Sequence, residues 1–105
     1  MAEVRDNAAE KRFEFTRDGV TAYSTYVRAG NVLTVDHTRV PKEAEGKGMA
    51  SALTRGVLDI IRGRGEKIIP VCPFTAAYMR KHSETRDLLA EPDWLEKHPP
   101  EPRKS

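Results

Sequence analysis

The spacing of apolar and polar positions changes once along the chain, near Pro41. Before this residue, apolar and aromatic side chains alternate with polar ones in short stretches. These stretches are separated by Asp18-Gly19 and Ala29-Gly30-Asn31, which are typical hairpin turns. Pro41 has no N–H to donate and ends the last stretch. The first part of the chain is therefore predicted to form an antiparallel β-β-β meander, with strands over residues 13–15, 20–28 and 32–40.

In the second part the apolar spacing becomes that of a helix. Five apolar residues share one face of a helix over residues 49–61, namely Met49, Leu53, Val57, Ile60 and Ile61. Gly63 and Gly65 end this helix, residues 67–72 are typical of a buried strand, and Pro73 suits the first turn of a second helix. The order β-β-β-α-β-α predicts an α/β fold with a mixed sheet and helices packed on it. Its strand–helix–strand unit is expected to form a right-handed crossover with parallel strands.

At 105 residues the chain is long enough for one domain, which we expect to span residues 12–90. Residues 1–11 lack a sustained apolar period and are predicted to be an N-terminal tail. Residues 91–105 contain four of the seven prolines, which predicts a Pro-rich C-terminal tail. Within it, Trp94 and Leu95 are expected to pack onto the domain, because a lone tryptophan in such a segment usually docks.

Composition and charge exclude several classes of protein. The single cysteine, Cys72, can form no internal disulfide, and the longest apolar stretch is far shorter than the roughly 20 residues of a membrane span. Charged residues near the start stand where a signal peptide needs an apolar run. These features predict a cytoplasmic protein without a membrane segment. Residues 13–90 carry 12 basic and 9 acidic residues, an excess too small for nucleic-acid binding but suited to a small polyanion held at one place.

Residues 41–50 join the third predicted strand to the first predicted helix and contain Gly46 and Gly48. Glycines at this spacing let a ligand approach the backbone, and the helix N-terminus adds free N–H groups and a positive dipole end. With two lysines nearby, the loop is predicted to bind phosphate or pyrophosphate, the alternative being a tight turn. It lacks the Gly-x-x-x-x-Gly-Lys-Ser/Thr of a P-loop. It also lacks the third glycine of the dinucleotide fingerprint, because Ser51 stands there.

The sequence Gly46-Lys47-Gly48-Met49-Ala50, which follows a strand and opens an amphipathic helix, resembles the acetyl-CoA pyrophosphate loop of the GNAT superfamily of N-acetyltransferases. The pattern of that superfamily is Gln/Arg-x-x-Gly-x-Gly/Ala, and here Glu43 takes the place of Gln or Arg. A second set of segments is similar to those of short single-domain GNAT-like acetyltransferases. It consists of His37-Thr38-Arg39-Val40-Pro41 and Pro70-Val71-Cys72-Pro73-Phe74, followed by Tyr78 and His82.

The resemblance, which covers residues 12–89, implies a truncated GNAT-like fold and an acetyl-CoA-dependent N-acetyltransferase. The acceptor would be an unidentified amine, on a protein or a small molecule. The main chain near Arg39 and Val40 would pair with pantetheine as an added strand does. The loop would hold the pyrophosphate through Gly46, Lys47, Gly48, Met49 and Ala50. Two alternatives stay open, a non-catalytic acyl-CoA-binding module and a thioesterase that depends on Cys72.

Four side chains are candidates for chemistry or for support of the site. Cys72 follows a predicted strand at the sheet edge that also carries the glycine loop, so both are expected to face one crevice. It would accept the acetyl group covalently, line the thioester site, or serve as a small buried hydrophobe. His37 is a candidate base for the amine or a structural histidine. Tyr78 is a packing residue or, as the resemblance implies, protonates the departing CoA thiolate. His82 is expected to cap its helix, and the histidines and the cysteine show no metal-ligand spacing.

Overall fold

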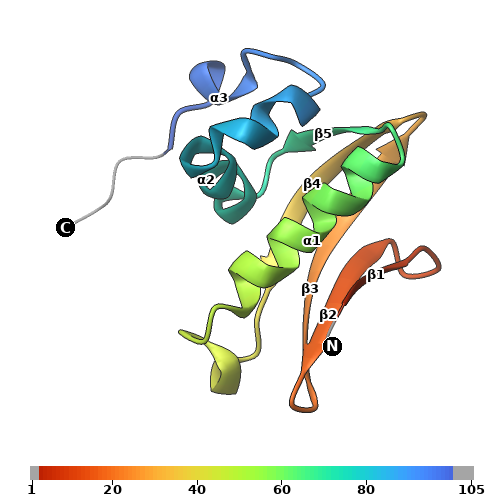
Figure 1. Cartoon of the computed structure of the whole chain (residues 1–105), viewed down its shortest axis with the longest axis vertical. Helices are drawn as coiled ribbons and strands as arrows, with labels where there is room; N and C mark the ends of the chain where they lie inside the picture. Colours follow the sequence, from red (N-terminus) through yellow and green to blue (C-terminus); the bar gives the residue numbers. More distant parts are fainter. Residues whose placement is uncertain (1–2, 101–105) are drawn as a thin grey trace.

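The computed structural model describes residues 3–100 of the chain. Its five strands form one sheet in which the spatial order follows the sequence order (Figure 1). The first four strands are antiparallel to their neighbours, and the fifth is parallel to the fourth. They are β1 (Val4–Asn7), β2 (Arg12–Arg17), β3 (Val20–Ala29), β4 (Val32–Arg39) and β5 (Lys67–Pro70). The predicted α/β class, with a mixed sheet and packed helices, is confirmed.

Two helices pack on the sheet. α1 (Met49–Gly63) lies across β2 and β3, and α2 (Pro73–Lys81) lies beside it against β4 and β5 (Figure 1). The shorter helical segments are η1 (Lys42–Ala44), η2 (Ser83–Leu88) and α3 (Trp94–Lys97). Among the helices of residues 3–100, none has the length and apolar character needed to cross a membrane.

The core lies between the sheet and α1. Alternate strand residues form one side of the core, and the apolar stripe that gave the helical period forms the other. The fully buried members include Phe13, Leu33 and Ile68 from the strands, and Leu53 and Ile61 from α1. The other face of the strands carries mainly polar side chains, as expected for an antiparallel sheet with one solvated face.

β1 is the element that the apolar pattern does not predict. It pairs with β2 from Val4↔Phe15 to Asn7↔Arg12, although it contains a single apolar residue. Val4 packs against the core, and polar contacts hold the rest of the strand, because Arg5 and Asn7 each donate a hydrogen bond of 3.0 Å to Glu14. Analysis of hydrophobic period cannot detect a strand that is joined to its neighbour by charge. The division into a domain over residues 12–90 and two tails stays a prediction.

The segment after α2 folds back against that helix. Leu95 is buried and Trp94 is partly buried against the core, which confirms that both pack onto the domain. Arg80 holds the segment by donating hydrogen bonds to the carbonyl oxygens of Leu95 at 3.1 Å and His98 at 2.6 Å. The His98 ring stacks on Trp94 with the ring centres 3.5 Å apart. Prolines in this segment therefore do not prevent a short ordered helix.

Candidate functional site

β4 has a strand on both sides over its first half only. It pairs with β5 from Val32↔Lys67 to Val35↔Pro70, and the Cys72 N–H then donates to the Val35 carbonyl at 2.9 Å. Beyond this point residues 37–39 pair with β3 but with no other strand of residues 3–100. The regular ladder ends at Val71, whose N–H donates to the Ile69 carbonyl of its own segment at 3.1 Å and not to β4. The two parallel strands therefore separate and leave one edge of β4 open.

A β-bulge lies where β4 and β5 separate. Tyr26 pairs with Val35 and Thr25 with His37, so that Asp36 is an extra residue on β4. The Thr25 hydroxyl donates a 2.5 Å hydrogen bond to the Asp36 carboxylate and fixes the extra residue. Because a bulge bends a strand and increases its twist, it directs the second half of β4 away from β5.

The glycine loop leads from this open half of β4 into α1. Gly46 and Gly48 have φ values of +80° and +76°, a region that glycine enters without strain. Gly48 is the N-cap residue, and its carbonyl accepts the first helical hydrogen bond, from Ala52 at 3.0 Å. The N–H groups of the first turn have no acceptor within the helix. The Arg17 side chain holds the loop by donating to the Lys47 carbonyl at 3.2 Å.

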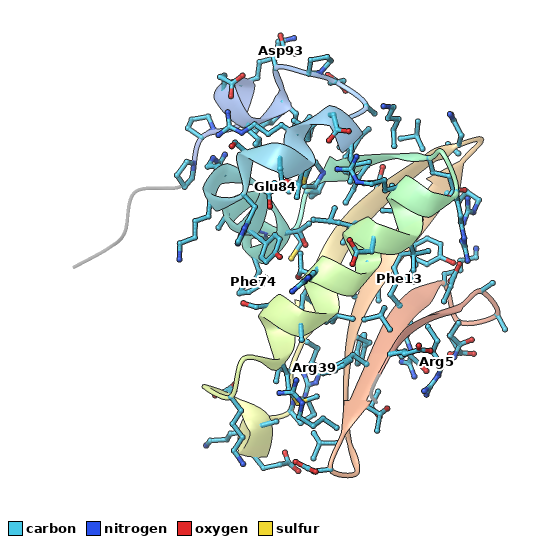
Figure 2. The ribbon with its side chains drawn as sticks, in the orientation of Figure 1. Arg5, Phe13, Arg39, Phe74, Glu84 and Asp93 are labelled. Atoms are coloured by element: carbon cyan, nitrogen blue, oxygen red, sulfur yellow. The ribbon has the colours of Figure 1, made fainter. Side chains whose placement is uncertain are left out.

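Two adjoining cavities join the loop to the open strand, and together we call them the groove. Their volumes are about 510 and 270 Å³. Both are lined by Val40, Glu45, Ala50 and Phe74. The larger adds His37, Thr38, Arg39 and Lys42, and the smaller adds Ala44, Gly46, Gly48, Met49 and Ser51. Figure 2 shows Arg39 and Phe74 near the N-terminal half of α1.

The groove brings together most of the predicted cofactor-binding residues with one predicted catalytic residue. Its lining contains His37 together with Arg39, Val40, Gly46, Gly48, Met49 and Ala50. Lys47 lies between the two glycines, with its carbonyl held by Arg17. Arg39 and Lys42 add two basic side chains to the lining of the larger cavity. The roles assigned to these residues stay predictions.

Cys72 lies directly behind the groove. It is the N-cap residue of α2 and is 3% exposed. Its thiol donates to the Thr38 hydroxyl at 3.4 Å, and the Thr38 and Ser24 hydroxyls are 2.8 Å apart. Since Thr38 lines the groove, this hydroxyl is the group that a ligand meets before the thiol.

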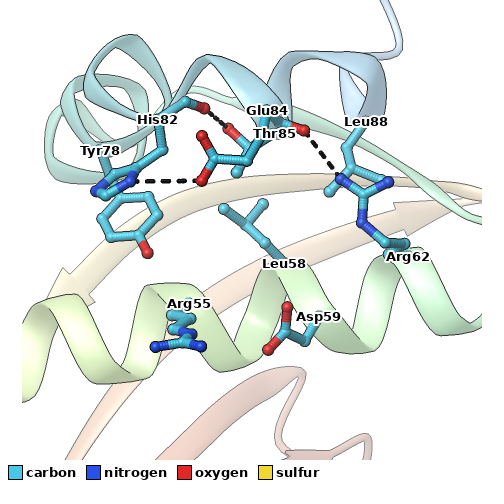
Figure 3. A pocket seen from close by; sticks show the side chains of 9 residues that line it. All are labelled: Arg55, Leu58, Asp59, Arg62, Tyr78, His82, Glu84, Thr85 and Leu88. Carbon is cyan, nitrogen blue, oxygen red and sulfur yellow. Dashed lines mark hydrogen bonds and ion pairs between the residues drawn. The ribbon is translucent and has the colours of Figure 1, made fainter.

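Tyr78 faces a different cavity, of about 300 Å³, between α1, α2 and η2 (Figure 3). Its ring stacks on His82 with the ring centres 4.1 Å apart, as expected for residues one turn apart on one helix face. His82 is the C-cap residue of α2, which agrees with its predicted capping position. Burial raises the pKa of Tyr78, and nearby Glu84 and Asp59 raise it further, while Arg55 lowers it. The hydroxyl therefore keeps its proton at neutral pH.

Among the groove residues to which sequence reasoning gave no role are Thr38 and Phe74, although both stand in the segments that resemble the family. Plain alternation along β4 places Thr38 on the face opposite to Val35, but the bulge at Asp36 shifts the alternation by one residue. Thr38 consequently points toward Ser24 and Cys72 on the core face. Phe74 is an aromatic residue directly after the helix-starting Pro73, a position that exposes its side chain. That position could have identified it.

No group of three or more His, Cys, Asp or Glu side chains within residues 3–100 is arranged to hold a metal ion.

Comparison with known proteins identifies the family to which this open-stranded α/β domain belongs. The family model for GCN5-related N-acetyltransferases matches residues 12–88. The chain therefore belongs to the GCN5-related N-acetyltransferase family. Among solved structures, it is similar to the NMR solution structure of a GCN5-like protein from Staphylococcus aureus, whose name assigns it to the N-acetyltransferases. The TM-score is 0.63 and the identity 27%, over 83% of this chain and 86% of that chain. No curated protein sequence matches the chain.

Proposed function

We propose that the protein is an acetyl-CoA-dependent N-acetyltransferase that binds its co-substrate in the groove. The observation that carries this proposal is the continuity of the groove, which joins a glycine-capped helix N-terminus to an unpaired strand edge. The helix N-terminus suits a pyrophosphate, and the unpaired strand edge suits an amide-containing arm. Membership of the GCN5-related N-acetyltransferase family supports an acetyltransferase reaction.

The pyrophosphate would be held by main-chain N–H groups of the loop and of the first turn of α1, from Gly46 to Ala50. Positive φ at both glycines turns the backbone toward the ligand without a Cβ in the way. Arg39 and Lys42 add positive charge, against the single carboxylate of Glu45 in the lining. The free edge of β4 near Arg39 and Val40 would pair with the amides of the pantetheine arm.

The reaction forms a C–N bond between the amine and the acetyl carbonyl carbon and breaks the C–S bond of the thioester. His37 is exposed, lines the groove and would accept the proton that the amine loses. The thiolate of CoA requires a proton, and Tyr78, whose pKa is raised by burial, would supply it. In that role, the thioester would lie at the side of α2 that faces α1, where Tyr78 is located. Most of the rate would come from positioning the two reactants.

Direct attack by the amine is favoured over an acyl-cysteine route. Cys72 is buried, and its thiol is hydrogen-bonded to Thr38, which lines the groove in its place. Water and amines would reach Thr38 first. The same burial gives the thioesterase alternative no support, so Cys72 is assigned a role behind the thioester site.

The experiment is calorimetric titration of acetyl-CoA and of CoA into the wild type and two variants. Gly46→Glu adds a carboxylate where the pyrophosphate would lie, and we expect at least about tenfold weaker binding, or 1.4 kcal/mol. Gly30→Glu is the matched control, because Gly30 also has positive φ and open space but lies at the opposite end of β4. It should bind as the wild type does.

Amine-dependent release of free CoA thiol then separates an enzyme from a binding module. A protein that binds acetyl-CoA but releases no thiol with any amine of a broad panel would be the non-catalytic module. Absence of saturable binding to the folded wild type at millimolar acetyl-CoA would overturn the proposal as a whole.

A further inference from the structure

The solvated face of the sheet, on the side away from α1, carries a cluster of charged and aromatic side chains beside His37. The cluster consists of two rows of paired residues across β2, β3 and β4, namely Arg12, Thr25 and His37 in one row and Glu14, Tyr23 and Arg39 in the next. The residues that alternate with them, such as Phe13 and Ser24, are buried on the core side. Because neighbouring strands are about 4.8 Å apart, the backbone of Arg12 lies two strand spacings from that of His37.

The guanidinium of Arg12 is fixed in place but keeps unused donors. Its Nε donates to the Glu14 carboxylate at 2.7 Å, and its Cζ lies 4.6 Å from the centre of the Tyr23 ring. The two terminal NH2 groups donate to no residue in the described part of the chain. An arginine that is already ordered loses little side-chain entropy when its free N–H groups bind a carboxylate or a phosphate.

The charge on this face favours an anion over a cation. Three arginines, Arg5, Arg12 and Arg39, stand against two carboxylates, Glu14 and Asp36. Both carboxylates already accept hydrogen bonds from neighbouring side chains, whereas no carboxylate within residues 3–100 forms an ion pair with Arg39. A second positive charge on an acceptor amine would therefore be disfavoured here, while a negative charge would meet free donors.

The open edge of β4 connects this face to the groove. The larger cavity of the groove is lined by His37 and Arg39, which are exposed, and also by Thr38, which points to the core side. In the proposed function, acyl-CoA occupies the side of the edge that carries the glycine loop and α1. The solvated face is then the approach that stays open for the acceptor, and it leads to His37 past Thr25 and Tyr23.

We propose that Arg12 is a specificity-determining residue that binds an anionic group of the acceptor, and that the acceptor is a small primary amine carrying a carboxylate or a phosphate. This inference rests on the proposed function. The amine would lie at His37, and the anionic group would lie above β3, within reach of the free NH2 groups of Arg12. Arg39 adds positive charge on the other side of Tyr23. Polyamines, whose far end is positive, are disfavoured acceptors.

The test measures release of free CoA thiol at saturating acetyl-CoA with amines that differ in the charge of their far end. Propylamine is neutral there, β-alanine carries a carboxylate, O-phosphoethanolamine carries a phosphate, and 1,3-diaminopropane carries a second ammonium. We expect kcat/KM of the wild type to be at least about tenfold higher for one of the two anionic amines than for propylamine. For 1,3-diaminopropane it should be lower than for propylamine. Comparison of β-alanine with O-phosphoethanolamine distinguishes a carboxylate from a phosphate.

Arg12→Gln should lower kcat/KM for the preferred anionic amine about tenfold or more, mainly through KM, and should leave propylamine within about twofold. Arg5→Gln is the matched control. Arg5 also donates to Glu14, at 3.0 Å, but it lies on β1, one strand further from His37. Its loss should have a similar structural cost and leave the preference for the anionic amine unchanged. Arg12→Lys, which keeps the charge, should retain more of the preference than Arg12→Gln.

Two kinds of result would overturn the inference. One is a wild type that uses propylamine or 1,3-diaminopropane as well as either anionic amine. The other is a preference that survives in Arg12→Gln or that falls equally in Arg5→Gln. In both cases the proposed function still stands, because acetyl-CoA binds and an amine releases thiol. Absence of acetyl-CoA binding, or of thiol release with every amine, would overturn the proposed function and the inference together.

Discussion

The two halves of β4 have the same neighbour on one side and different surroundings on the other. Residues 32–35 lie between β3 and β5, and their inward side chains, Leu33 and Val35, are fully buried. After the bulge residue Asp36, residues 37–39 pair with β3 alone, and Asp36, His37 and Arg39 are exposed. The first half contributes side chains to the core, while the second presents main chain and polar groups to the groove. One strand thus passes from a structural to a candidate functional role at a single bulge.

The contrast shows how a small domain makes a binding edge without exposing a long, regular strand. An open sheet edge invites pairing with other chains. Here the open edge begins only after the bulge and is three residues long, and it is flanked by the glycine loop and α2. The core in the first half fixes the position of the second half. Changes in the two halves should therefore have opposite signatures, one in stability and the other in binding.

The largest expected effect comes from Leu33→Ala in the closed half. Removal of this fully buried side chain should lower the free energy of unfolding by about 2–5 kcal/mol, because it leaves a cavity in the core. In the open half, His37→Ala should change stability by less than about 0.5 kcal/mol, since the side chain is exposed. Urea unfolding measures both values.

The order of the two variants should be reversed when acetyl transfer is measured instead of stability. If His37 accepts the proton from the amine, His37→Ala should lower kcat by about 100-fold or more. Leu33→Ala, measured at a temperature where it is folded, should lose far less. Two variants that lose stability alike would contradict the division of β4 into two halves.

The second effect is at β1, on the far side of the sheet from the groove. A Cβ added at Gly56 of α1 would lie 2.2 Å from Val4 Cγ2, so Gly56→Ala should push β1 away from α1. We expect a loss of about 1–3 kcal/mol, despite the better helix propensity of alanine. Acetyl-CoA binding should not change, because β2 and β3 separate β1 from β4, the strand that lines the groove.

A double-mutant cycle checks the cause of this loss. Val4→Ala removes the atoms that the new Cβ would meet, so the double variant Val4→Ala, Gly56→Ala should be more stable than the sum of the two single effects predicts. Additive effects would mean that the loss of stability in Gly56→Ala does not come from a clash with Val4.

The sequence predicts most of the elements that form the core, but only part of the region around the open half of β4. β2 to β5, α1 and α2 follow from the apolar period and from turn residues, which act locally. The glycine loop is predictable because glycine at a helix start has a specific backbone meaning. The bulge is not, since Asp36 is a polar residue in an otherwise regular pattern. The sequence therefore also fails to predict that Thr38 points to the core face. It does not predict β1 either, because polar contacts attach most of this strand to β2.

The smallest effect is the dependence of the β1–β2 pair on pH. Hydrogen bonds from Arg12 at 2.7 Å, and from Asn7 and Arg5, lower the pKa of Glu14 below its usual range, although burial opposes them. A carboxyl with a lowered pKa in the folded state stabilises the protein above its unfolded pKa of about 4.3, and this stabilisation is lost as the pH falls through the lower folded value. Glu14→Gln cannot ionise. Its melting temperature should be a few degrees below that of the wild type at pH 7, and the gap should close below about pH 4. A gap that is independent of pH would show that the shape of Glu14, and not its charge, joins β1 to the sheet.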